Sequence, residues 1–136
     1  MKVKLDKWAH MPTKAHEADG GWDLYAVKGQ VVKARDSAVF DTGVHMQIPV
    51  GYAGLMVSKS GLNFDHDIVT TGLIDARYTG SIKVKMYNKG DKDYTVMPGD
   101  KISQIMVVPI LNEKLEPVDF LEETERGDGG FGSTGR

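Results

Sequence analysis

Short apolar stretches separated by turn residues limit what this chain can fold into more than any other feature of its sequence. They recur at intervals of about ten residues, the spacing of strands in a β-sandwich or β-barrel. No stretch keeps a helical 3.6-residue period for long, and only residues 60–64 could form a brief helical turn. We therefore predict an all-β fold, with strands at 22–27, 38–40, 44–48, 52–57, 81–88, 94–96 and 102–108.

The segment 81–88 has the clearest strand pattern. Apolar Ile82, Val84 and Met86 alternate with lysine and tyrosine, so the two sets of side chains would face opposite sides of the strand. Residues 88–91 (NKGD) are typical of a turn. We therefore expect the strand at 94–96 to pair back against the strand at 81–88.

The composition excludes several classes of protein. At 136 residues the chain has the length of one domain, and the absence of cysteine excludes a disulfide framework and a thiolate nucleophile. The four histidines lack the spacing of a zinc site. A net charge of −2 without a basic block argues against direct nucleic-acid binding, and the longest apolar run, 105–111, is too short to span a membrane. With no secretory signal evident, we expect a cytoplasmic protein, in the host cytoplasm if a virus or phage encodes it.

The C-terminal segment 123–136 (ETERGDGGFGSTGR) differs in composition from the rest of the chain, and we treat it as an arm. Gly127, Gly129 and Gly132 satisfy the pattern G-x-G-x-x-G of dinucleotide-binding proteins. That pattern requires a helix after it and an acidic residue about 20 positions further on, and neither follows Gly132. The sequence therefore excludes a dinucleotide-binding turn at this position.

The same arm carries three groups that suit a nucleotide. Arg126 has a planar, permanently charged side chain that fits phosphate, and a base could stack on the ring of Phe131. Gly132, Ser133 and Thr134 offer backbone amides and hydroxyls to an anion. These groups indicate a lid over a bound nucleotide, although a flexible polar tail is the alternative for a glycine-rich terminus.

Five motifs, in a fixed order, cover nearly the whole chain. They are GGWDLYA (20–26), SKSGL (58–62), GLIDARYTG (72–80), GDKISQI (99–105) and RGDGGFGSTG (126–135). With these motifs the sequence resembles the homotrimeric deoxyuridine triphosphate nucleotidohydrolases, the dUTPases. The resemblance implies Mg²⁺-assisted hydrolysis of dUTP to dUMP and pyrophosphate. Such an enzyme limits dUTP, and so uracil in DNA, and supplies dUMP for dTMP synthesis.

The resemblance also implies a fold and an assembly. The fold would be a distorted jelly-roll-like β-barrel of the β-clip type, formed by one domain (1–136) with a flexible C-terminal lid arm (123–136). Three such chains would form a trimer with three shared sites. The third motif would come from one subunit, the first, second and fourth motifs from a second subunit, and the arm from the third.

The resemblance assigns a catalytic residue and a pocket for the nucleoside. Asp75 would be the general base that activates a water molecule for attack on the α-phosphate. Tyr78 would place its ring against the deoxyribose and leave no room for a 2′-hydroxyl. Residues 72–80 would fit closely around uracil and exclude the 5-methyl group of thymine. The residues implied to bind base and sugar are Gly72, Leu73, Ile74, Tyr78, Lys83 and Phe131.

The resemblance further assigns residues to the triphosphate and its metal ion. Asp23 would contact Mg²⁺ through the water shell, which this ion retains in most protein sites. Asp100 and Lys101 would support the site structurally. The residues implied to bind the phosphates are Lys59, Ser60, Gly61, Gln104, Arg126, Gly132, Ser133 and Thr134.

The chain departs from the family pattern at a few positions. Lys59 stands where the family usually has arginine, so the charge is kept but the two-pronged grip on phosphate is lost. Residues 69–71 (VTT) occupy a region where many members carry an asparagine, and Arg77 is an unusual neighbour for the expected base. Two other functions stay open at this stage: a dCTP deaminase of the same fold, and a binding module such as a nucleotide sensor or the partner of a regulatory protein.

Overall fold

The structure is a computed structural model, and it describes residues 1–132, 134 and 135. Strands dominate the described residues, and the single helix among them is α1 (Ser60–His66). The strands are β1 (Val3–Leu5), β2 (Trp22–Tyr25), β3 (Gln30–Val32), β4 (Ser37–Asp41), β5 (Val44–Met46), β6 (Tyr52–Val57), β7 (Ile68–Ile74), β8 (Lys83–Asn88), β9 (Tyr94–Val96) and β10 (Lys101–Pro109). This architecture confirms the predicted all-β fold.

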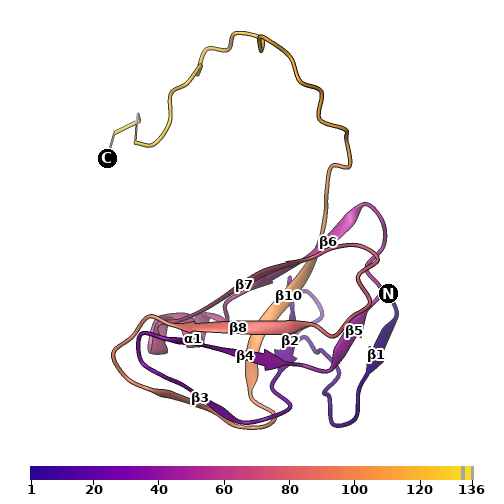
Figure 1. Cartoon of the computed structure of the whole chain (residues 1–136), viewed down its shortest axis with the longest axis vertical. Coiled ribbons are helices and arrows are strands. Elements are labelled where there is room, and N and C mark those ends of the chain that lie inside the picture. Colours follow the sequence, from indigo (N-terminus) through magenta and orange to yellow (C-terminus); the bar gives the residue numbers. More distant parts are fainter. Residues whose placement is uncertain (133, 136) are drawn as a thin grey trace.

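The strands form one large antiparallel sheet and two small ribbons. The sheet has the order β2-β10-β6-β7-β8-β4, and the ribbons pair β1 with β5 and β3 with β9. The sheet curls: in Figure 1 the strands β8 and β4, at one end of the strand order, are drawn across β10 and β2, at the other end. The curl encloses the apolar core between its two ends.

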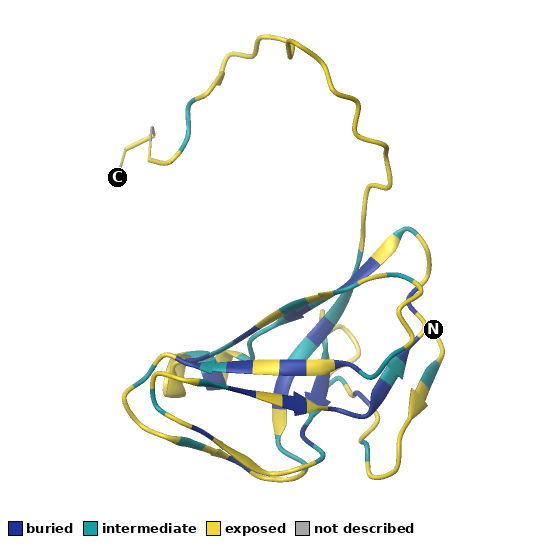
Figure 2. Cartoon of the chain, viewed as in Figure 1, coloured by how far each residue is buried: buried dark blue, intermediate teal, exposed yellow. Residues whose placement is uncertain are grey.

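The core follows the alternation that the sequence predicts. In β8, Val84 and Met86 are buried while Lys83 and Lys85 are exposed. β6 has the predicted bounds, and β10 exceeds its predicted bounds by one residue at each end. Buried positions, dark blue in Figure 2, lie in the body, whereas the segment after β10 is drawn almost entirely as exposed. The largest fully buried apolar side chains are Leu24, Ile68, Ile82, Met86, Ile102, Ile105, Val32, Val44, Val84 and Val96.

One predicted pairing is wrong: β9 pairs with β3 and not with β8. The reason lies in the side chain of Asn88, at the end of β8, which donates hydrogen bonds to the carbonyls of Val32 and Lys92. The Asp93 carboxylate accepts the backbone N–H of Ala34. These bonds carry the chain after β8 across to β3 as a wide loop, where a tight turn would have returned it along β8.

The sequence pattern misses β7, because its residues (IVTTGLI) do not alternate cleanly between apolar and polar. It also misses the three-residue strands β1 and β3. α1 begins where predicted but continues to His66. The next residue, Asp67, caps the helix with a left-handed φ of 54°. Among the described residues, no helix combines the length and the apolar character that a membrane crossing requires.

The C-terminal segment leaves the body directly after β10. The N–H of Ile110 still bonds the carbonyl of Gly51, and from Leu111 onward the described residues extend away from the sheet (Figure 1). The departure therefore precedes the expected arm boundary at residue 123. Its apolar side chains are almost fully exposed, with Leu115 at 98% and Phe120 at 89%. These side chains have no core to bury them within a single chain.

Gly54 offers a test of the packing between β6, β7 and β10. A Cβ built on Gly54 would lie 2.8 Å from the Cδ1 atoms of Ile48 and Ile105 and 3.3 Å from Cβ of Ile74. Because the site has no room, Gly54→Ala should lower the free energy of unfolding by about 1–3 kcal/mol. Urea denaturation at one fixed protein concentration measures this. Gly20→Ala, where a Cβ meets nothing within 4 Å, is the matched control; equal stability of the two variants would contradict the packing argument.

Candidate active site

The first, second and fourth motifs meet in a row across the large sheet. Gln104 on β10 is paired with Asp23 on β2 and, on its other side, with Val57 on β6. Val57 is in turn paired with Thr71 on β7. Lys59 and Ser60 follow directly after the end of β6. Antiparallel pairing thus gathers residues that are up to about 80 positions apart in the sequence.

Asp23 is the electrostatic centre of this row. Its carboxylate is buried and forms ion pairs with the ammonium groups of Lys59, at 2.5 Å, and Lys101, at 2.7 Å. Burial alone would raise the pKa of Asp23, but the hydrogen bonds from Lys101 and Lys59 outweigh it and hold the pKa below its usual value. The same contact raises the pKa of Lys101. Asp23 and Lys101 therefore both carry their charges at neutral pH.

A hydroxyl network holds the backbone beneath the row. The Ser58 hydroxyl donates to the Thr70 carbonyl and accepts the Thr70 N–H. The hydroxyls of Thr70 and Ser103 bond each other at 2.8 Å, and Ser103 also donates to the Val57 carbonyl. The Gln104 side chain donates to the Ser58 carbonyl. Because the Thr70 hydroxyl is used here, it is not available to read a base.

The third motif lines a separate cleft of about 360 Å³. Of the predicted nucleoside-binding residues, the structure brings five together here with the predicted base Asp75. The cleft is lined by Met56, Thr71, Gly72, Leu73, Ile74, Asp75, Tyr78, Ser81, Lys83 and Lys85. Met56, Ser81 and Lys85 are missed by the sequence analysis, whereas Thr71 belongs to the segment 69–71 that it singles out as a departure from the family pattern. The alternation along β8 could have identified Lys85, because it lies on the same face as Lys83.

A tight turn after β7 positions the two chemically important residues of the cleft. The Tyr78 N–H bonds the Asp75 carbonyl, and Arg77 between them has a left-handed φ of 69°. The Tyr78 hydroxyl donates to the Ser81 carbonyl, and its ring covers Gly80 so closely that a Cβ there would collide with it. Asp75 is exposed at the mouth of the cleft. The ring is thus held in place while the carboxylate is open to solvent.

Thr71 borders both the charged row and the cleft, whereas Asp75 lies apart from the row. Thr71 lies level with Val57 in the row, and Asp75 lies four residues further along the chain. At a rise of about 3.3 Å per residue this places them ~13 Å apart along the strand. The arm residues are not at either place: Phe131 is fully exposed, and the Arg126 guanidinium donates to the carbonyl of Gly129, within the arm itself.

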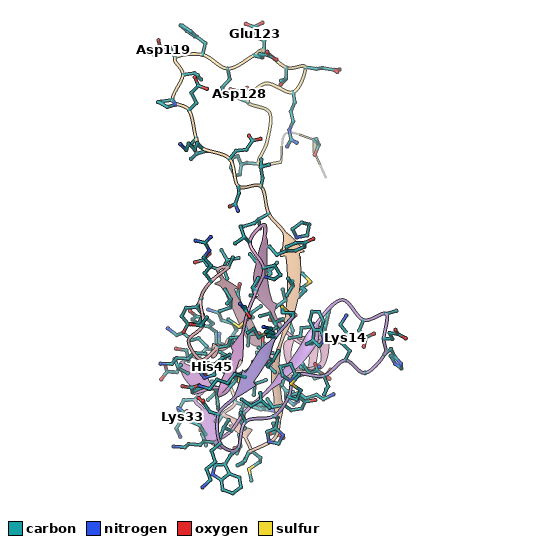
Figure 3. The ribbon with its side chains drawn as sticks, turned by 90° about the vertical axis from the view of Figure 1, so that its right-hand side faces the viewer. Lys14, Lys33, His45, Asp119, Glu123 and Asp128 are labelled. Carbon is teal, nitrogen blue, oxygen red and sulfur yellow. The ribbon has the colours of Figure 1, made fainter. Side chains whose placement is uncertain are left out.

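Figure 3 shows the C-terminal segment from the side: Asp119, Glu123 and Asp128 lie on it, away from the body that carries His45 and Lys33. Gly132 and Thr134 are exposed on the arm as well, whereas Ser133 lies outside the described residues. A single chain therefore brings the predicted site residues together in three groups and does not join the groups.

The donor groups present fit a hydrated magnesium ion and not a closely caged one. Within the described part of the chain, no cluster of three or more His, Cys, Asp or Glu could hold a metal ion. Each oxygen of Asp23 already accepts one lysine, and each keeps a second lone pair that can accept a water O–H. This fits an ion that takes most of its ligands from phosphate oxygens and water.

Comparison with known proteins gives consistent results. The model of the dUTPase family matches residues 7–135. Deoxyuridine 5′-triphosphate nucleotidohydrolase of Clostridium acetobutylicum is 40% identical over 97% of this chain and 93% of its own length. The protein of the same name from Kluyveromyces lactis is 38% identical over 100% of this chain and 94% of its own length.

Solved structures are similar over the whole fold. The dUTPase of Staphylococcus bacteriophage 80alpha with dUpNHpp has a TM-score of 0.93 and 32% identity, and the match covers 99% of this chain and 98% of that one. A variant dUTPase from phage phi11 of S. aureus, whose structure concerns a structural Mg(II) ion, has a TM-score of 0.83 and 29% identity over 90% of this chain and 98% of that one. These matches confirm the predicted jelly-roll-like fold class.

Asp23 provides a test of the charged row. Asp23→Asn would leave Lys59 and Lys101 facing each other without an anion, so we expect the free energy of unfolding at pH 7 to fall by about 1–3 kcal/mol. Because the pKa of Asp23 lies below its usual 3.8, its contribution is complete above that pH and is lost as the pH falls through the lower folded-state pKa. Urea midpoints of wild type and variant should therefore converge in acid.

The control for this measurement is Asp93→Asn, which removes an ion pair with Lys33 in which both side chains are about half exposed or more. It should change the urea midpoint far less than Asp23→Asn does. A pH-independent gap between wild type and Asp23→Asn would contradict the electrostatic account.

Proposed function

Because the chain belongs to the dUTPase family, the deoxyuridine 5′-triphosphate nucleotidohydrolases, we propose that it hydrolyses dUTP to dUMP and pyrophosphate with Asp75 as the general base. The observation that carries this proposal is that Gly72, Asp75 and Tyr78 line one cleft. In a cell, such a reaction limits dUTP and supplies dUMP for dTMP synthesis. We propose the cytoplasm as its compartment.

In the proposed reaction the Asp75 carboxylate takes a proton from a water molecule at the mouth of the cleft. The water oxygen bonds to the α-phosphorus, and the bond from that phosphorus to the bridging oxygen breaks, so that pyrophosphate leaves. The exposure of Asp75 supports this role, because a base must reach both a water molecule and the substrate. In-line attack requires that the leaving pyrophosphate be held on the side of the α-phosphorus opposite to the attacking water.

The nucleoside pocket is built from a fixed ring and exposed backbone. Tyr78 is held through its hydroxyl by the Ser81 carbonyl, so its ring can reject a ribose by occupying the space of the 2′-hydroxyl. A Cβ at Gly72 would meet the terminal methyl group of Met56, which packs over this glycine from β6. Backbone groups of residues 72–74, together with the side chain of Lys83, would contact uracil.

The charged row would bind the triphosphate. Lys59 would turn from Asp23 toward the phosphates, while Lys101 stays as the partner of Asp23. Ser60 and Gly61 follow Lys59 directly and are exposed. The side-chain amide of Gln104 donates a hydrogen bond to the carbonyl of Ser58, just before Lys59. Bound Mg²⁺ would neutralise part of the phosphate charge, with Asp23 contacting its water shell.

We propose a homotrimer in which each site takes the cleft from one subunit, the charged row from a second and the arm from the third. The position of the arm supports this arrangement, because a single chain keeps Phe131 and Arg126 away from both the cleft and the charged row. The exposed apolar side chains of the segment after β10, such as Leu115 and Phe120, support it too, since they need a surface to cover them. Arg126, Phe131, Gly132, Ser133 and Thr134 would then close over the substrate.

The test of the proposed function is pyrophosphate release from dUTP, dTTP, dCTP and UTP, each with and without Mg²⁺. We expect turnover of dUTP alone and a strong dependence on the metal ion. Sedimentation of the full chain measures the proposed trimer independently. Tight dUTP binding without pyrophosphate release would favour a nucleotide sensor, and ammonia release from dCTP would favour a deaminase.

Asp75→Asn should retain dUTP binding but lower kcat by about 10²–10⁴-fold, because the amide cannot accept the proton of the attacking water. Steady-state pyrophosphate release and equilibrium dUTP titration measure the two effects separately. Asp91→Asn, an exposed aspartate in the loop between β8 and β9, is the matched control. Wild-type turnover by Asp75→Asn would exclude this residue as the base.

Truncation after Thr124 should leave a folded body, because the core lies entirely within residues 24–105. Without Arg126 and Phe131 the site stays open to bulk water, so we expect kcat for dUTP to fall by about 100-fold or more. Circular dichroism verifies the fold, and pyrophosphate release gives the rate. A truncated chain that turns over dUTP normally would exclude the lid.

A further inference from the structure

The loop that follows Tyr78 is tied to the body at several points outside the five motifs. The Ile82 N–H bonds the Val44 carbonyl at 2.8 Å, and the Thr42 N–H and hydroxyl both donate to the Ile82 carbonyl. The Ser81 hydroxyl donates to the Asp41 carboxylate. These bonds fix residues 81 and 82. Nearer to Tyr78, the next contact is made by a histidine side chain.

His45 on β5 bridges this loop to the N-terminal segment. Its Nδ1 lies 2.7 Å from the Thr79 carbonyl oxygen, and its Nε2 lies 3.0 Å from a carboxylate oxygen of Asp6. The side chain is only 17% exposed. Carbonyl and carboxylate oxygens are both acceptors, so each ring nitrogen must carry a proton to bond its partner. A neutral ring would bond one partner and direct a lone pair at the other.

We propose that His45 is a positioning residue for the nucleoside pocket: as an imidazolium it ties the Thr79 carbonyl to Asp6 and so holds the loop that carries Tyr78. Thr79 is the residue directly after Tyr78, and the peptide that accepts the bond joins it to Gly80, on which the Tyr78 ring rests. Loss of the bond would loosen the ring that reads the sugar. This inference rests on the proposed function of the cleft.

The charges around His45 favour the imidazolium. Asp6 bonds the ring directly, and Asp41 acts on it from the end of β4. Two lysines act against these carboxylates. Lys4 on β1 is paired with His45, and Lys2 lines, together with His45, a second cleft of about 350 Å³ that does not include Asp75. Lys83, at the start of β8, is paired with Asp41 and reduces that residue's effect.

Together these groups favour the charged form of the ring. The hydrogen bond to Asp6 has the largest effect and the bond to the Thr79 carbonyl the next largest, and they raise the pKa of His45 above its usual 6.5. A raised folded-state pKa gives the tie a definite pH range. The tie is fully formed below about pH 6.5 and is lost as the pH rises through the higher folded-state value. The range in which it is lost therefore lies on the alkaline side of pH 6.5.

The first experiment needs no substrate. In the full-length protein, NMR follows the His45 imidazole and the Gly80 backbone amide, which belongs to the bonded peptide, from pH 5 to 9. We expect both to titrate with one midpoint above about 6.5. Asp6→Asn keeps an acceptor but removes the charge, so it should move both midpoints to lower pH. In His45→Gln the Gly80 amide should no longer titrate.

The second experiment measures KM for dUTP in wild type and in His45→Gln across the same pH range. The ratio of the two KM values cancels the ionisation of the substrate itself. We expect a ratio of roughly fivefold near pH 6, the effect of one lost hydrogen bond, falling toward one at pH 9, with kcat little changed. His10→Gln, an exposed histidine outside the cleft, should give a ratio near one throughout.

The two experiments separate the two proposals. If wild type releases no pyrophosphate from dUTP, the proposed function fails, and the NMR titration still tests the tie. A Gly80 amide that ignores the His45 titration, or a His45 midpoint at or below about 6.5, would overturn the positioning role. A KM ratio that is constant with pH would overturn it as well, because a purely structural defect does not follow the protonation of one ring.

Discussion

The pairing of β10 with two neighbours is the constraint on which the rest of the structure depends. β10 forms backbone hydrogen bonds with β2 on one side and β6 on the other, and so fixes the register of three motifs against one another. A slip of one residue would turn Gln104 into the core and Ile105 out of it. The ion pairs of Asp23 and the hydroxyl network beneath them are consequences of this register.

The charged row is thus assembled before any nucleotide binds. The body carries 14 basic and 12 acidic residues up to position 110, whereas residues 111–136 carry three basic and seven acidic ones. In its extended conformation, this acidic segment 111–136 does not bury its own apolar side chains. Charge and burial both favour its attachment to a weakly basic body, and the proposed shared site would take that body from another copy.

Local pattern predicted much of this fold, and its failures have a common cause. Alternation correctly identified β8, because a strand with one buried face records its environment in its own residues. Apolar stretches between turn residues correctly located β6 and β10. The local pattern missed β7, whose Thr70 serves a buried network, and it paired β9 with the wrong strand. In both cases the deciding groups, Ser103 for Thr70 and Val32 for Asn88, are remote in sequence.

The sequence by itself determined the strand content, the inner and outer faces, the five motifs and the residues that could do chemistry, because these depend on side-chain type and on spacing along the chain. Only the tertiary structure decided which motifs meet. It brings Asp23 to Lys59 and Lys101 and sets Asp75 apart from them, because strand register, and not motif order, controls distance across a sheet. It also joins His45 to Thr79, a contact across 34 positions that no local pattern encodes.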